Sequence, residues 1–118
     1  MGIGFMQGRL CEPVDGRIQA FPWNDWESEF PAAQRLDIGL MEWTLDQDRL
    51  HENPLMTDEG QERIRELSAL HSLQVQSLTA DCIMQEPFFK ASPMRRNVLL
   101  KNLMAIIDAS KKVGIVYI

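Results

Sequence analysis

Cysteine is scarce in this sequence of 118 residues, which contains only Cys11 and Cys82. Two cysteines so far apart provide neither the framework of a disulfide-rich fold nor the close spacing of a metal site. Free cysteines are typical of a reducing compartment. We therefore expect a cytoplasmic protein without disulfide bonds.

Positive charge is also in short supply, because 12 basic residues stand against 17 acidic ones and give a net charge of −5. The only adjacent basic pairs are Arg95-Arg96 and Lys111-Lys112, and both fall in one predicted helix, where a solvated face accounts for them. Nucleic-acid-binding proteins concentrate positive charge on one surface. This sequence therefore does not predict a nucleic acid as its partner.

Long hydrophobic runs are absent as well. No apolar run approaches the roughly 18 residues that a membrane-spanning helix needs. No charged and then apolar leader precedes the first apolar run, which begins at Ile3. We expect neither secretion nor insertion into a membrane.

The sequence does contain a regular alternation of short apolar runs and longer helical patterns. The apolar runs predict strands at 3–6, 38–43, 75–80 and 115–118. Helices are expected over 25–36, from the N-cap Thr57 onward, and from Ser92-Pro93 to Gly114. Because Pro31 is tolerated only in a first helical turn, the regular part of the first helix should begin near Ser28. This order, β-α-β-α-β-α-β, predicts an α/β fold with a parallel sheet.

Two of the patterns also predict which side chains are buried. On the second helix we expect one apolar stripe formed by Ile64, Leu67, Leu70 and His71. On the third strand we expect strict alternation, which places on one side Val75, Ser77 and Thr79 and on the other Gln76, Leu78 and Ala80.

The alternation is compatible with a doubly wound open sheet or with a barrel, and two arguments favour the barrel. A parallel strand at 115–118 with no helix to cover it would be poorly protected in an open sheet. Three and a half βα units in this length extrapolate to about 270 residues for eight units, near the roughly 250 of a (β/α)₈ barrel. We expect a single partial domain over 1–118, the N-terminal half of such a barrel.

Five short segments carry a resemblance to a known family. In chain order they are MQGRL at 6–10, IQAFPW at 18–23, MEW at 41–43, ENPL at 52–55 and SLTADC at 77–82. In this order and spacing the chain resembles the xylose isomerase-like barrel superfamily, and most of all its sugar phosphate isomerases and epimerases. The superfamily also contains proteins similar to endonuclease IV and the second family of AP endonucleases.

The resemblance implies a sugar or sugar-phosphate isomerase or epimerase that moves a proton next to a carbonyl with the help of a divalent metal, Mn, Mg or Co. The metal ligands of the family, Glu, Asp, His and Glu, lie on strands five to eight, beyond the four strands expected here. The resemblance therefore implies no metal site and little activity for this chain alone. Two alternatives remain, a metal-dependent phosphodiesterase of the endonuclease branch and a non-catalytic half-barrel that assembles with a second copy through exposed strand edges. The endonuclease branch also uses histidines from early strands, which the expected strand ends here do not offer.

The active site of a barrel lies at the carboxyl ends of its strands, and this position selects the candidate substrate-binding residues. Gln7 and Arg9 follow the first strand, and Arg9 can pair with a phosphate or carboxylate or form a structural salt bridge. Glu42 lies near the end of the second strand, where it can bind sugar hydroxyls or pair with Arg9. Asp81 ends the third strand and can orient the substrate or cap a turn.

For each of the remaining candidate residues, packing or local structure is an alternative to a functional role. Trp23 can form an apolar wall for the C–H face of a sugar or pack beneath the long loop, whereas Trp43 is expected to pack. Cys82 lacks a neighbouring base and is expected to be a small buried thiol. Asn53, before Pro54, predicts turn chemistry. Of the two histidines, His71 is expected to be packed and hydrogen-bonded, and His51 carries no clear signal.

Overall fold

A computed structural model of the protein describes residues 3–13 and 20–118. The sheet contains β1 (Gly4–Met6), β2 (Leu40–Thr44) and β3 (Gln74–Thr79) in the order β1-β2-β3, and both neighbouring pairs are parallel. The predicted fourth strand contributes one parallel bridge, between Ser77 and Tyr117. The four runs therefore lie beside one another in chain order, which confirms the predicted parallel α/β arrangement.

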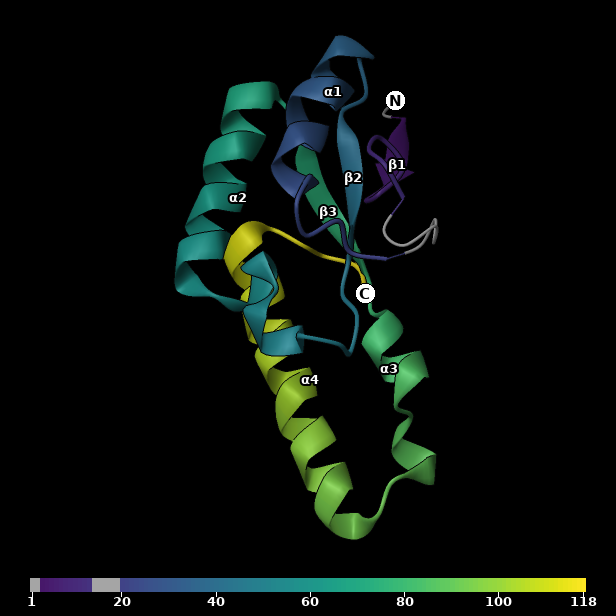
Figure 1. Ribbon diagram of the computed structural model, residues 1–118. Helices are drawn as coiled ribbons and strands as arrows, with labels where there is room; N and C mark the ends of the chain where they lie inside the picture. Colours follow the sequence, from purple (N-terminus) through teal and green to yellow (C-terminus); the bar gives the residue numbers. More distant parts are fainter. Residues whose placement is uncertain (1–2, 14–19) are drawn as a thin grey trace.

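Within the described residues, four α-helices connect and follow these strands. They are α1 (Glu29–Arg35), α2 (Asp58–His71), α3 (Asp81–Gln85) and α4 (Pro93–Val113). Three of them correspond to the predicted helices, whereas α3 was not predicted, because only a turn was expected after the third strand. Figure 1 shows α3 and α4 extending together beyond the carboxyl end of β3, joined by the turn that contains residues 88–92.

The ends of the helices follow the predicted local chemistry. Thr57 Oγ1 accepts a hydrogen bond from the N–H of Gly60 at 3.0 Å, and Ser92 Oγ accepts one from the N–H of Arg95 at 3.2 Å. Gly114 ends α4 in the left-handed conformation with a φ of 91°. A short 3₁₀ turn at Trp26–Ser28 precedes α1, so the regular helix begins next to Ser28, as Pro31 requires.

The hydrophobic core lies on one face of the sheet. Met41, Trp43, Val75 and Leu78 project from the strands into a single buried cluster. The helices complete this cluster with Phe30 and Ala33 from α1, Ile64 and Leu67 from α2, Cys82 from α3, and Ile106 and Ala109 from α4. Figure 1 shows α1 and α2 on the same side of the strands. All four helices therefore contribute to the packing of one sheet face.

Two predictions about burial are wrong. Met41 pairs with Val75 but Glu42 pairs with Ser77, so Gln76 is an extra residue that forms an irregularity in β3. Strict alternation fails there, and Val75 and Leu78 are both buried. Leu70 is 68% exposed, whereas Ile64 and Leu67 are buried. Each step of three residues turns a helix by about 300°, about 60° short of a full turn, and two such steps from Ile64 carry Leu70 away from the buried stripe.

The hydrogen bond predicted for His71 is confirmed, but the side chain is only half-buried and is not part of the core cluster. Its Nδ1 lies 2.8 Å from Oε1 of Gln34, in a hydrogen bond that joins the end of α2 to α1. The long loop predicted between the first strand and the first helix includes residues 14–19, which lie outside the described residues, as do positions 18 and 19 of one matching segment. No helix within 3–13 and 20–118 is long and apolar enough to cross a membrane.

Candidate functional site at the carboxyl ends of the strands

Gln7 joins the ends of β1 and β2. Its backbone N–H donates to the carbonyl of Glu42 at 2.9 Å, and the chain then turns at Gly8, which has a φ of 95°. The side-chain Oε1 of Gln7 accepts from the N–H of Thr44 at 3.0 Å, in the place where the next carbonyl of a longer strand would accept. Gln7 is only 1% exposed, so this candidate residue is part of the end of the sheet.

Two polar atoms at this junction have no hydrogen-bond partner. They are Nε2 of Gln7 and Oγ1 of Thr44, and both are buried. Since unpaired buried polar atoms are uncommon and costly, they are typical of a place where a polar group is bound or the structure adjusts. The junction of β1 and β2 is therefore a buried part of the candidate site that contains unpaired polar groups.

Glu29 fixes the loop that follows β1, and the sequence analysis did not identify it. Its carboxylate accepts from the N–H of Gly8 at 2.9 and 3.0 Å and from the N–H of Leu10 at 3.0 Å. Burial raises the pKa of Glu29, and the hydrogen bonds from the backbone of Leu10 and Gly8 oppose this shift. An acidic residue in the first turn of a helix was visible in the sequence, but its reach to Gly8 was not.

Glu42 lies on the face of the sheet opposite the core, within a row of residues in register. Met6 pairs with Glu42, Glu42 pairs with Ser77, and Ser77 pairs with Tyr117. Side chains in register on adjacent parallel strands project from the same face, about 4.8 Å apart. Glu42 therefore lies in the middle of β2, two residues before its end, and is half-buried.

This row lies in a depression of about 660 Å³, including its open side. The lining residues are Gly4, Phe5, Met6, Leu40, Met41, Glu42, Gln76, Ser77 and Tyr117. Since the described helices pack on the other face, we call this surface the open face of the sheet. It brings together a carboxylate and two hydroxyl groups, a combination that can bind a ligand rich in hydroxyls.

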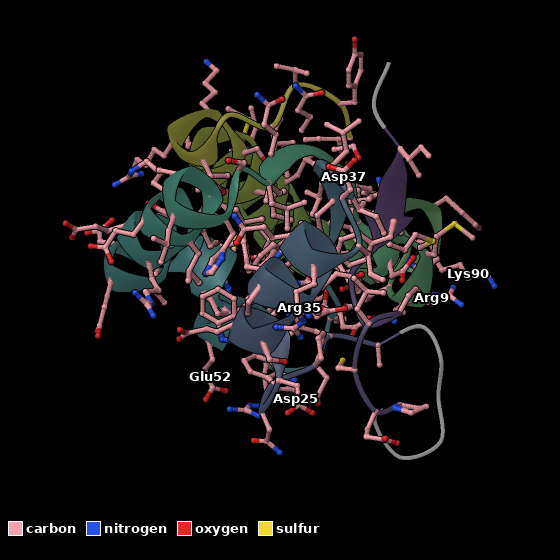
Figure 2. All side chains as sticks on the ribbon, turned by 90° about the horizontal axis from the view of Figure 1, so that it is seen from above. Arg9, Asp25, Arg35, Asp37, Glu52 and Lys90 are labelled. Carbon is pink, nitrogen blue, oxygen red and sulfur yellow. The ribbon has the colours of Figure 1, made fainter. Side chains whose placement is uncertain are left out.

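Arg9 is exposed and lies close to one end of this row. Its Nη2 atom is 3.9 Å from Sδ of Met6, the register partner of Glu42. Within the described residues no ion pair joins Arg9 to Glu42, so the salt bridge weighed as an alternative is not formed. Figure 2 shows Arg9 at the periphery of the molecule on the side of β1, away from Asp25 and Glu52.

Trp23 is half-buried in an aromatic group and carries a cation on its ring. Phe21 meets it edge to face, with the ring centroids 4.8 Å apart, and Cζ of Arg49 lies 3.8 Å from the centroid of the Trp23 ring. One face of Trp23 is therefore already covered. Trp43 is packed as predicted, and its Nε1 donates to Oδ1 of Asn53 at 3.0 Å.

Asp81 is the first residue of α3 and is half-buried. The neighbouring carboxylate of Asp46, which the sequence analysis missed, accepts from the N–H of Phe21 at 3.0 Å and from Nε2 of Gln85 at 3.2 Å. Asp46 thereby joins the loop after β1 to α3. Cys82 is a buried thiol as predicted, and burial raises its pKa to about 11.

The structure brings Gln7 and Arg9, which follow β1, close to Glu42 in the middle of β2. Trp23 belongs to an aromatic group with Phe21, Trp26 and Trp43, and Asp81 starts a separate helix after β3. The described part of the chain holds no group of three or more His, Cys, Asp or Glu residues that could bind a metal ion. No protein-family model, curated protein or solved structure matches the chain.

Proposed function

We propose that this chain forms the N-terminal part of a (β/α)₈ barrel that interconverts sugars or sugar phosphates as isomers or epimers. One observation carries the proposal: parallel strands in consecutive order have their helices on one face and leave Glu42 on the other. A doubly wound sheet has helices on both faces, whereas a barrel turns its uncovered face inward.

The residues of this chain would form the substrate-binding side of the site. The carboxylate of Glu42 accepts hydrogen bonds from sugar hydroxyls, and the guanidinium of Arg9 binds an anionic group such as a phosphate. Gln7 holds the ends of β1 and β2 in register, and Asp81 lies at the neighbouring strand end. Trp23 is half-buried, and its exposed part can contact the C–H groups of a sugar.

The proposed activity implies a divalent metal, but the residues described here do not fit one. The resemblance assigns the ligands of that metal to later strands, so no step of the reaction is derived from a metal in this chain. The residues of this chain act by binding and orienting the substrate. The chain by itself is expected to bind sugar phosphates weakly and to show little or no turnover.

A binding experiment tests the proposal. Titration of the ¹⁵N-labelled chain with a ketopentose phosphate should shift the amide signals of Arg9, Glu42 and their register partners. The substitution Arg9→Gln should weaken binding of the phosphorylated sugar about tenfold, because a charge-assisted pair is lost, and should not affect the neutral sugar. Inorganic phosphate is the control for a contact with the anion alone. Shifts confined to the helices, or an equal loss of both sugars in the Arg9→Gln variant, would contradict the proposal.

A further inference from the structure

We infer that Glu42, Ser77 and Tyr117 form one binding row for the hydroxyl groups of a polyol chain, with the anionic end of the ligand at Arg9. This inference rests on the proposed function and deepens it. From the sequence only Glu42 of this row was a candidate, and neither Ser77 nor Tyr117 was.

The register of the sheet places these three side chains in line. Glu42 pairs with Ser77, and Ser77 pairs with Tyr117, so the row crosses three neighbouring strand positions at the spacing of about 4.8 Å. All three residues line the same depression on the open face. Met6 continues the row beyond Glu42, and Nη2 of Arg9 lies 3.9 Å from its sulfur atom.

The chemistry of the row selects hydroxyl groups. An ionised Glu42 only accepts hydrogen bonds, whereas the hydroxyls of Ser77 and Tyr117 both donate and accept. A chain of neighbouring hydroxyl groups can donate to the carboxylate and exchange hydrogen bonds with the other two. The guanidinium of Arg9 lies beside Met6, so it attracts a phosphate to the Met6 end of the row, and the hydroxyl chain then extends past Glu42 toward Tyr117. The row therefore predicts both the class of ligand and its direction.

A purely structural role explains this row less well. The inner layers of a barrel are filled mainly by branched apolar side chains, yet only Met6 of the four residues in the row is apolar. Within the described residues, the carboxylate of Glu42 has no hydrogen bond or ion pair. Burying an unpaired carboxylate in a packed interior is costly, so a polar occupant is favoured at this place.

The test uses xylitol, a polyol that carries no phosphate and has no carbonyl to react. The ¹⁵N-labelled full chain is titrated with xylitol, and dissociation constants are obtained from the shifts. The amides of Met6, Glu42, Ser77 and Tyr117 should shift together. We expect Glu42→Gln to weaken binding about tenfold and Ser77→Ala and Tyr117→Phe each about threefold, as for loss of one charged and one neutral hydrogen bond.

The control variant is Glu59→Gln, which removes an exposed carboxylate from α2 and should leave the dissociation constant unchanged. Unchanged amide signals from the helices show that each variant remains folded. The inference is overturned if no shift occurs at about 100 mM xylitol, if the shifts lie away from the row, or if the three variants bind as tightly as the unmodified chain.

The two proposals can fail separately. If a ketopentose phosphate binds at Arg9 and xylitol does not bind along the row, the inference fails and the proposed function stands. If xylitol binds along the row and phosphorylated sugars bind no better than neutral ones, the row is supported and the sugar phosphate proposal loses its anion site.

Discussion

The carboxylate of Glu29 accepts hydrogen bonds from the N–H of Gly8, 21 residues earlier in the chain, at 2.9 and 3.0 Å. A third bond, from the N–H of Leu10, completes its contacts with the loop after β1. Gly8 can present its N–H because it adopts a φ of 95°. A single buried carboxylate therefore holds the loop that contains Arg9 against the start of α1.

Replacing Glu29 by Ala should destabilise the protein by about 2–3 kcal/mol, because the N–H groups of Gly8 and Leu10 lose their acceptor in a buried place. Urea unfolding measures this change. Glu27→Gln is the matched control, since Glu27 lies two residues earlier in an exposed ion pair with Arg63 and its loss should barely move the midpoint. Equal midpoints for Glu29→Ala and Glu27→Gln would show that the Glu29 contacts contribute nothing.

The stability of the protein should also depend on pH through Glu29. Burial raises the pKa of Glu29 in the folded state above its ordinary value of 4.5. Between that value and the raised pKa the folded state binds more protons than the unfolded state, so this residue makes stability fall as pH rises. The unfolding free energy of the unmodified chain minus that of the Glu29→Gln variant, measured across this window, should decrease as pH rises. If this difference increases with pH, the pKa of Glu29 in the folded state is lowered and not raised by its surroundings.

Asn53 should be among the most sensitive polar positions. Its Oδ1 accepts from Nε1 of Trp43 and from the N–H of Leu55, both at 3.0 Å, and it is 1% exposed. Asn53→Ala should cost about 2–4 kcal/mol in urea unfolding, because two buried donors lose their acceptor. Asn53→Asp keeps both acceptor contacts, and its protonated form can also donate to the carbonyl of Thr44, whereas burial disfavours its ionised form. If Asp proves as disruptive as Ala in acid, where its carboxyl is protonated, the two acceptor contacts do not explain the role of Asn53.

Gly60 should resist a substitution that normally stabilises a helix. Alanine is favoured over glycine in a helix by up to about 1 kcal/mol, but a Cβ at Gly60 would lie 2.1 Å from the carbonyl oxygen of Pro54. Gly60→Ala should therefore lower the melting temperature and disturb the turn before α2. Gly39→Ala is the control, because no atom lies within 4 Å of its Cβ position. A rise in melting temperature for Gly60→Ala would refute the close packing of this turn.

The sequence predicted best those features that depend on neighbouring residues. Thr57, Ser92 and Gly114 act within one helical turn of their own positions, so their roles follow from local chemistry. The strands and helices alternate as expected for the same reason, since each has its own hydrophobic period.

Features that depend on distant parts of the chain were not predicted. The extra residue Gln76 arises from pairing with β2, and it moves Leu78 onto the buried face. Glu29 and Asp46 act through contacts with loops about 20 residues away or more. The candidate site shows the same division, because Gln7, Arg9 and Glu42 were recognised from strand ends, whereas Ser77 and Tyr117 became candidates only through the register.

The central claim is that the strands lie side by side in chain order, all parallel, with Glu42, Ser77 and Tyr117 in one row. Nuclear Overhauser contacts between backbone protons of adjacent strands test this claim most directly. We expect parallel contacts that pair Met6 with Glu42, Glu42 with Ser77, and Ser77 with Tyr117. Antiparallel contacts, or contacts that place β1 beside β3, would contradict the open face and the function proposed for it.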